Sequence, residues 1–179
     1  MSNEHKMAGV STLPLIIILG LIFGAGYFLL RGDIDLSKFL EDNRSLEMRR
    51  LEDFPAVVPV TTEHEKYRVV IKSDQELIDF LAKVDETNNL ALAEKIDYDR
   101  EMLIGVATEN FGVTGHSMKI RKIYMDRDSN SLLVSSMITQ PDDSCEVTDY
   151  ENVAVDLVAV DKTDMPVDFE TLRQTDFCE

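Results

Sequence analysis

The side chains of this chain that could carry acid–base or nucleophilic chemistry are few, and their spacing does not assemble a catalytic site. The sequence has three histidines among 179 residues. His116 precedes Ser117, but adjacent residues of a strand point to opposite faces, so these two cannot act on each other as base and nucleophile. His5 and His64 stand among polar residues, where a solvated histidine is the default. The sequence also lacks a phosphate-binding loop, zinc-ligand spacing and a nucleophile elbow, and we expect neither an enzyme nor a cofactor.

The run of Asp126, Asp128 and Asn130 imitates the start of a calcium-binding loop. Such a loop needs a glycine at its sixth position and a glutamate at its twelfth. Ser131 and Met137 occupy those positions here. Because Asp, Asn and Ser also favour turns on their own, the sequence predicts a polar hairpin turn and no metal site.

The charge of the chain excludes one class of partner. The sequence has 34 acidic and 18 basic residues, which give a net charge of −16. Such an excess of negative charge repels phosphate backbones, so nucleic-acid binding would need a local basic stripe. The densest basic run is Lys119, Arg121 and Lys122, on an expected strand. We therefore exclude nucleic acid as a partner.

A strongly apolar stretch near the N-terminus is the clearest signal in the sequence. It runs for 20 residues without a charge and ends at Leu30. A helix of this length rises about 30 Å, which matches the hydrocarbon core of a bilayer. We expect a short tail over residues 1–10 and a transmembrane helix over residues 11–31, through which the chain binds the membrane. Residues 24–26 (Gly-Ala-Gly) offer a cleavage site, but the apolar run continues past them, which favours a retained anchor.

The leader before this stretch leaves a second interpretation open. Residues 6–9 (Lys-Met-Ala-Gly) resemble the leader of type IV pilin-like proteins, which is cut after a glycine. Those proteins usually carry a glutamate at the fifth mature position, where this chain has Pro14. The alternative to an uncut anchor is therefore a pilin-like structural subunit whose mature chain begins at Val10.

Basic residues flank the apolar stretch on both sides. Only Lys6 precedes it, whereas Arg31, Lys38 and several further arginines follow it. Counted by Lys and Arg alone, these residues would place the larger part of the chain in the cytoplasm. Long domains translocate largely regardless of charge, however, and the basic residues are interleaved with acidic ones. We expect a single-pass membrane protein with its C-terminal domain outside the cytoplasm.

The sequence after the anchor divides into a stalk and a folded domain. Residues 32–55 mix charges of both signs with an irregular apolar period, which indicates a solvated stalk; a helix lying on the membrane is the alternative. The folded domain is expected over residues 56–179. Within it, Ser73 and Glu76 form a capping box before apolar positions at helical spacing, which predicts a helix over residues 74–84.

The remainder of the domain shows β patterns. Residues 102–107 are a continuous apolar run, typical of a central strand buried on both faces. Residues 118–125 alternate, with a slip at residues 122–123 that predicts a bulge, and residues 132–139 should return as the antiparallel partner. Apolar residues over 153–159 line one face of the last long strand. One principal helix and about six strands joined by short turns predict an α+β fold with a mainly antiparallel sheet.

Several short motifs occur in an order typical of one family. They are Ser73-Asp74-Gln75-Glu76-Leu77, the strand entry from Ile96 to Val106, Thr114-Gly115-His116-Ser117, Leu132-Leu133-Val134, Gln140-Pro141, Cys145-Glu146-Val147-Thr148, Val155 to Lys162, Pro166-Val167-Asp168-Phe169 and Cys178. In this order they resemble the C-terminal domain of the PrcB-like proteins, bacterial envelope proteins named after a protease-complex subunit. The resemblance covers residues 71–179, and His116 stands where the family often has Gly-Tyr.

The resemblance implies an exported accessory domain, which in one case is a stabilising subunit of a surface protease. Most family members have no assigned activity. We therefore expect a membrane-tethered, non-enzymatic domain that binds an unknown envelope protein, for example a protease. The turn at Thr114, Gly115 and His116 is the candidate interaction loop.

Cys145 and Cys178 are the only cysteines. Their spacing fits neither a CxxC redox motif nor a zinc site with four ligands. An even pair in an exported domain favours a disulfide, and the resemblance also places cysteines at comparable points. Two free thiols are the alternative, which a cytosolic domain would favour.

Overall fold

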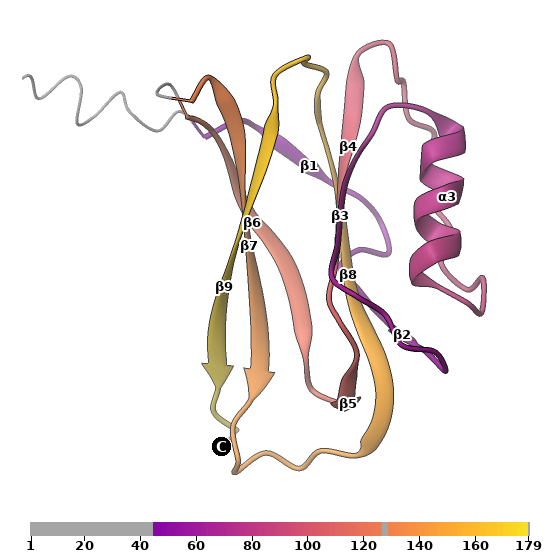
Figure 1. The fold of residues 1–179 in the computed structure, drawn as a ribbon, viewed down its shortest axis with the longest axis vertical. Coiled ribbons are helices and arrows are strands. Elements are labelled where there is room, and N and C mark those ends of the chain that lie inside the picture. Colours follow the sequence, from indigo (N-terminus) through magenta and orange to yellow (C-terminus); the bar gives the residue numbers. More distant parts are fainter. Residues whose placement is uncertain (1–44, 127–128, 179) are drawn as a thin grey trace, which may run out of the picture. The chain divides into compact units, whose positions relative to one another are not determined.

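The computed structural model describes residues 45–126 and 129–178, which form two β-sheets and a helix (Figure 1). The predicted tail (residues 1–10), the predicted transmembrane helix (residues 11–31) and stalk residues 32–44 lie outside the described residues. Within the described part, no helix combines the length and the apolar character that crossing a bilayer requires. The described residues form the C-terminal domain.

The larger sheet is built around its longest strand, β8 (Asp149–Asp161). On one side, β4 (Glu101–Ala107) pairs with β8, and β3 (Tyr67–Ile71) pairs with β4. A short strand, β5 (Phe111–Val113), follows β4 along the same edge of β8. All of these pairs are antiparallel, so the mainly antiparallel sheet expected from the sequence is confirmed.

The smaller sheet contains the hairpin of β6 (Ser117–Asp126) and β7 (Ser131–Pro141), together with β9 (Val167–Asp176). The register of the hairpin shifts between Ile120 and Lys122, which confirms the predicted bulge. β9 lies parallel to β7. The sequence patterns did not predict β9 or its parallel pairing.

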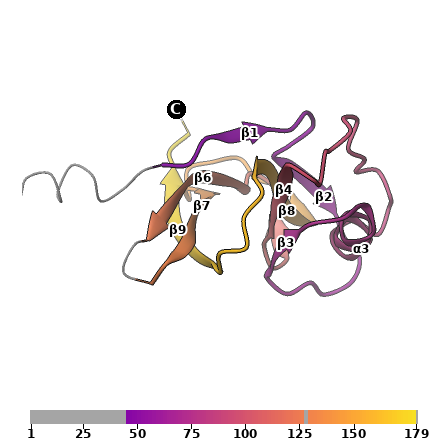
Figure 2. The same cartoon turned by 90° about the horizontal axis from the view of Figure 1, so that it is seen from above.

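Helix α3 (Asp74–Val84) and the smaller sheet cover opposite faces of the larger sheet (Figure 2). Alternate residues of β4 and β8 face these two layers. Leu103 and Leu157 belong to the core under the helix, whereas Ile104 and Val158 belong to the core between the sheets. All four are fully buried, so β4 is the central strand buried on both faces that its apolar run predicts.

The start of α3 and its position on the sheet follow from local sequence. The hydroxyl of Ser73 accepts a hydrogen bond from the amide of Glu76 at 3.3 Å, as the predicted capping box requires. The Glu76 carboxylate in turn accepts a bond from the amide of Lys72 at 2.5 Å. Gly105 of β4 lets the helix approach the sheet, because a Cβ at this position would lie 2.9 Å from the ring of Phe80.

The folded domain begins earlier than the sequence indicates. β1 (Met48–Arg50) and β2 (Ala56–Pro59) pair with successive stretches of β8, on the edge opposite β4. Between them, Leu51 and Phe54 are buried in the core under α3. The stalk predicted over residues 32–55 therefore differs from the structure over residues 45–55, because a charged three-residue strand has no apolar pattern that would reveal it.

Residues 45–50, which we call the strap, join the two sheets. Ser45 forms an isolated β-bridge with Tyr124 of β6, and the amide of Leu46 donates to the carbonyl oxygen of Ile123 at 2.7 Å. The strap then continues as β1 along β8, and Figure 2 shows it crossing from one sheet to the other. The chain thus enters the fold beside β6 and covers one edge of the two-sheet sandwich.

Candidate functional site

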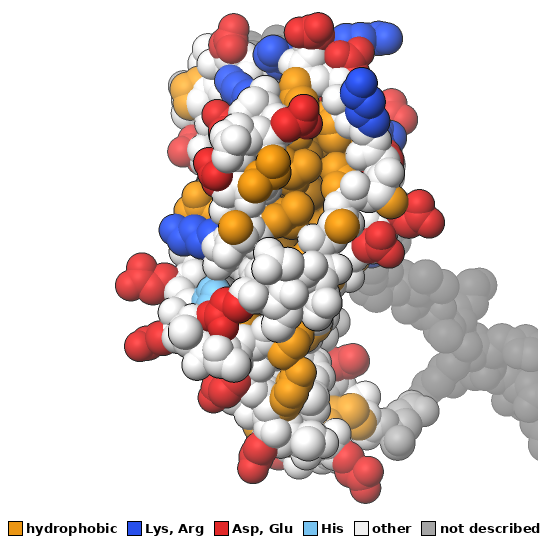
Figure 3. All heavy atoms as spheres, turned by 90° about the vertical axis from the view of Figure 1, so that its right-hand side faces the viewer, with side chains coloured by type: hydrophobic (Ala, Val, Ile, Leu, Met, Phe, Trp, Pro, Cys, Tyr) orange, Lys and Arg blue, Asp and Glu red, His pale blue; other side chains and the backbone are white. Residues whose placement is uncertain are grey.

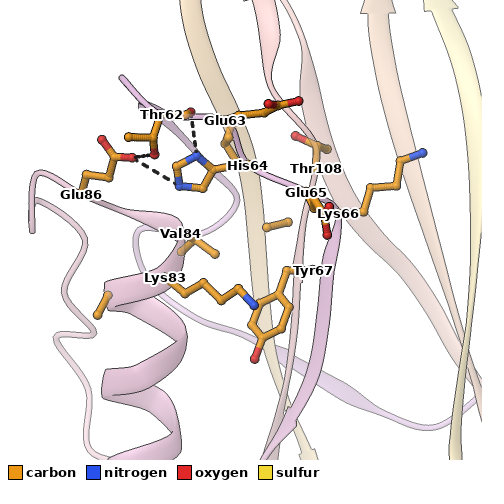
Figure 4. Close-up of a pocket in the computed structure, with 13 residues that line it drawn as sticks. Thr62, Glu63, His64, Glu65, Lys66, Tyr67, Lys83, Val84, Glu86 and Thr108 are labelled. Atoms are coloured by element: carbon orange, nitrogen blue, oxygen red, sulfur yellow. Dashed lines mark hydrogen bonds and ion pairs between the residues drawn. The ribbon is translucent and has the colours of Figure 1, made fainter.

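A pocket of about 500 Å³ opens between the β2–β3 connection and the C-terminal end of α3 (Figure 4). Most of its lining residues are polar or charged. They are Thr62, Glu63, His64, Glu65, Lys66, Tyr67, Lys83, Glu86 and Thr108, and the apolar members are Ala82, Val84, Ala107 and Val153. The pocket is the place where the fold brings a histidine, carboxylates and lysines together.

The side chains of His64 and Glu86 face each other in this pocket (Figure 4). The Nε2 atom of His64 lies 3.8 Å from the Oε1 atom of Glu86. Its Nδ1 atom lies 3.1 Å from the carbonyl oxygen of Thr62. Hydrogen bonds from the hydroxyls of Thr62 and Thr61 hold the pKa of Glu86 below its ordinary value. These threonine–glutamate hydrogen bonds tie the β2–β3 connection to Glu86, just beyond the end of α3.

Several other polar side chains that line the pocket have partners within the fold. The hydroxyl of Thr62 donates to Glu86, and that of Thr108 accepts a hydrogen bond from the amide of Ala154 at 3.0 Å. The ammonium group of Lys83 lies 3.8 Å from the centre of the Tyr67 ring, which is a cation–π contact. None of the lining residues is a serine or cysteine, and we assign no reaction to this pocket. His64 stood among polar residues in the sequence, and nothing there indicated Glu86 as its partner.

Each residue of the candidate interaction loop (Thr114, Gly115 and His116) contacts another part of the domain. The amide of Thr114 donates to the carbonyl oxygen of Thr148. Gly115 has a φ of +93°, which favours glycine, and a Cβ there would lie 3.3 Å from Pro141. The half-buried ring of His116 stacks on Phe111 with the ring centres 3.9 Å apart. These contacts fix the position of the loop in the fold, and its role in binding stays a prediction.

The two cysteines lie beside this loop, at one end of the domain. The sulfur atoms of Cys145 and Cys178 are 2.06 Å apart, so the structure places the pair at disulfide distance, as the sequence favours. The pair links the β7–β8 connection to the residues that follow β9. We call this region, residues 142–150 with residues 177–178, the cysteine-bridged end.

The calcium-like run forms the predicted hairpin turn. Asp126 at the end of β6 pairs with Ser131 at the start of β7, and Asn130 adopts a left-handed φ of 51°. Asp128 lies outside the described residues. Among the residues with described positions, no group of three or more His, Cys, Asp or Glu side chains could hold a metal ion.

Sequence reasoning missed one buried charge. Asp156 lies in the middle of β8, is fully buried, and pairs with Arg50 of the strap at 2.7 Å. Burial raises the pKa of its carboxyl group above the ordinary value. The signal available in the sequence is a single aspartate between Val155 and Leu157, inside the otherwise apolar stretch of residues 153–160.

A second surface feature lies on the helix side of the domain. Figure 3 shows apolar side chains gathered in a hollow, with acidic and basic side chains around it. On this side of the larger sheet, Leu77 and Leu81 of α3 and Leu90 and Leu92 of the following loop are half-buried against the core. Ile78 on α3 is 58% exposed. The helix side therefore also carries exposed apolar surface.

These features define a small α+β domain with two packed sheets, a buried ion pair and a cysteine-bridged end. No family model matches the chain, and neither a curated protein nor a solved structure is significantly similar to it. The resemblance to the PrcB-like proteins therefore stays a prediction that is carried by the sequence motifs.

Proposed function

We propose that this chain is a membrane-tethered, non-enzymatic interaction domain of the bacterial envelope. Its C-terminal domain lies outside the cytoplasm and serves as an accessory or stabilising subunit of a partner complex, for example one that contains a protease. The apolar stretch at residues 11–31 supplies the tether. The observation that supports an interaction role most directly is the position of exposed apolar side chains relative to the entry point of the chain.

The chain enters the domain at Ser45, which bridges to Tyr124 and so lies beside Leu133 of β7. From Leu133, β7 runs to Pro141, a distance of ~26 Å at the usual rise per residue. The cysteine-bridged end begins at the next residue, Asp142. The amide of Asp142 donates to the carbonyl oxygen of Asp176, so the ends of β7 and β9 lie side by side there. Ser45, the first described residue, and the cysteine-bridged end therefore lie at opposite ends of the smaller sheet.

The cysteine-bridged end exposes three large apolar side chains. Val147 is 42% exposed, Tyr150 48% and Phe177 74%. Acidic residues surround them in the sequence, namely Asp142, Asp143, Glu146, Asp149 and Asp176. Aromatic side chains surrounded by a polar rim are typical of binding surfaces, so this end supports the proposed role.

Photocrosslinking in the native envelope tests the proposal. A photoreactive phenylalanine analogue replaces Phe177 in the full chain, and a matched chain carries it at Ile78, which is also strongly exposed but lies on α3. We expect Phe177 to crosslink one discrete envelope protein, and loss of the chain to shorten the lifetime of that protein. Crosslinking from Ile78 alone, or from neither position, would contradict the proposal.

The alternative is a type IV pilin-like structural subunit, which is supported by the leader before Val10. N-terminal sequencing of the mature protein separates the two functions. A chain that begins with methylated Val10 supports the pilin-like subunit, and a chain that retains residues 1–10 supports the tethered domain.

A further inference from the structure

β9 (Val167–Asp176) is an edge strand, and no strand in the described part of the chain pairs with its outer side. It pairs with β7 over its whole length without a shift in register, so the edge is long and regular. The opposite edge of the smaller sheet differs, because Ser45 and Leu46 bond to β6 there. β9 contains no proline. A regular edge of this kind is a template for a further strand.

The hydrogen bonds to β7 show which backbone groups point to the free edge. The carbonyl oxygen of Pro166 accepts from the amide of Leu132, and that of Asp176 accepts from the amide of Asp142. Along a strand, successive residues direct their backbone groups alternately to the two neighbours. Even-numbered residues from 166 to 176 therefore bond to β7. The N–H and C=O groups of residues 167, 169, 171, 173 and 175 point to the free edge.

The same alternation determines on which face of the smaller sheet each side chain of β9 lies. Phe169 packs into the core between the sheets, so the odd-numbered side chains face inward. Asp168, Glu170 and Leu172 therefore lie on the outer face, where Leu172 is 49% exposed. An added strand would meet two carboxylates two residues apart, followed by an apolar side chain.

We propose that the free edge of β9 accepts an extended segment of a partner protein as an additional strand. On the outer face, that segment carries two basic side chains two residues apart, opposite Asp168 and Glu170, and an apolar side chain opposite Leu172. Backbone hydrogen bonds give such a complex its affinity, and the side-chain pattern gives it specificity. The inference rests on the proposed interaction role and names the chemistry of the bound segment. The edge also leads directly to Phe177 at the cysteine-bridged end.

A second copy of this chain fits the edge less well. Antiparallel pairing of two β9 strands about Leu172 would set Asp168 of each copy opposite Asp176 of the other. Like charges directly opposite each other destabilise a strand pair. The net charge of −16 adds repulsion between the copies. Charge therefore favours a basic segment of a different protein.

Binding of a designed peptide to the full chain in detergent micelles tests the inference. The probe is the capped peptide TQTLTKVKV, whose lysines lie opposite Glu170 and Asp168 in antiparallel register. The control peptide, TQTLTEVEV, carries glutamates in their place. At low salt we expect the lysine peptide to bind roughly tenfold more tightly or better. Amide exchange should slow at Phe169, Thr171 and Arg173, while the even-numbered amides, already bonded to β7, change little.

Two variants at one position isolate the backbone contribution. Arg173→Pro and Arg173→Ala both lose the 3.2 Å ion pair with Glu109, but only proline also removes the outward N–H group. We expect the proline variant to bind the lysine peptide at least about tenfold more weakly than the alanine variant does. Equal affinities of the two variants would overturn the inference.

A charge reversal keeps the inference testable if the proline variant does not fold. Asp168→Lys should weaken binding of the lysine peptide and strengthen binding of the glutamate peptide; an unchanged preference would overturn the inference.

Amide exchange of the chain without peptide is a further test. If the outward amides of β9 are already protected from exchange, the edge is covered and the inference is overturned. Protection at every protein concentration would then mean that the chain covers its own edge, and protection that rises with concentration would mean a second copy. Peptide binding without a crosslink from Phe177 would contradict the proposed function and leave β9 a strand acceptor.

Discussion

Arg50 and Asp156 stand 106 positions apart in the sequence and form an ion pair of 2.7 Å between the two sheets. The Asp156 side chain is fully buried, whereas Arg50 reaches solvent. The same carboxylate accepts a hydrogen bond from the amide of Ile120 at 2.6 Å, and Arg50 donates to the carbonyl oxygen of Ile120. Because Ile120 lies at the bulge of β6, the ion pair satisfies backbone groups that a regular strand would pair, and it links strap, β6 and β8.

The first prediction concerns the pH dependence of this pair. Burial raises the pKa of Asp156, although hydrogen bonds from Ile120 and Arg50 act in the opposite direction. A group whose pKa is higher in the folded state contributes stability that is present below its unfolded pKa and is lost as pH rises through its folded pKa. The unfolding free energy of the wild type, relative to Asp156→Asn, should therefore fall from about pH 4 to about pH 7.

Urea unfolding of both proteins at both pH values measures this difference. The comparison with Asp156→Asn cancels the titration of the other carboxylates, which destabilises both proteins at low pH. A difference that stays constant, or that grows as pH rises, would contradict the raised pKa.

The second prediction separates the buried ion pair from its exposed neighbour. Arg50→Ala leaves a buried carboxylate without its cation, which should lower the unfolding free energy by about 3 kcal/mol. Arg49→Ala is the matched control, since Arg49 is more exposed and pairs with Glu101 at 2.9 Å on the surface; its loss should be below about 1 kcal/mol. Urea unfolding gives both values. Arg50→Ala should cost less in an Asp156→Asn background, and equal costs in both backgrounds would show that the two residues are not coupled.

The third prediction places the N-terminal boundary of the domain. A chain of residues 45–179 should be soluble and should melt cooperatively, because it keeps the strap, Leu51 and Phe54. A chain of residues 56–179 loses these buried side chains and leaves Asp156 without Arg50, so it should aggregate or melt without a cooperative transition. Circular dichroism melts of the two purified chains provide the test. Identical cooperative melts would mean that the strap adds nothing to the fold.

The elements that could be predicted from the sequence are those with a strong local signal. The cap at Ser73 and Glu76 defines the start of α3, and the apolar run of β4 predicts a strand buried on both faces. β1 and β9 were not predicted, because both carry charged residues and have an exposed side. Their strand conformation depends on pairing with β8 and β7, which are distant in sequence.

The same distinction applies to the candidate sites. Cys145 and Cys178 could be predicted as a pair because a chain with two cysteines allows one pairing. His64 with Glu86 could not be predicted, since tertiary packing alone brings the two side chains together. The edge of β9 that no described strand covers could likewise not be predicted, because an edge is defined only once the order of the strands is known.

The last prediction concerns the cysteine pair. The bond between Cys145 and Cys178 would close a loop with a sequence separation of 33 residues. By loop entropy, such a bond stabilises a domain by about 3–4 kcal/mol. Cys145→Ser and Cys178→Ser should each lower the unfolding free energy by about that amount, and the double variant should lose no more than either single one. A reducing agent should destabilise the wild type to the same extent and leave the unfolding free energy of the variants unchanged.

Thiol counting on denatured, non-reduced protein from the native envelope should find no free thiol at Cys145 or Cys178. Two free thiols per chain would refute the disulfide and would also weaken the case for a domain outside the cytoplasm, where disulfides persist.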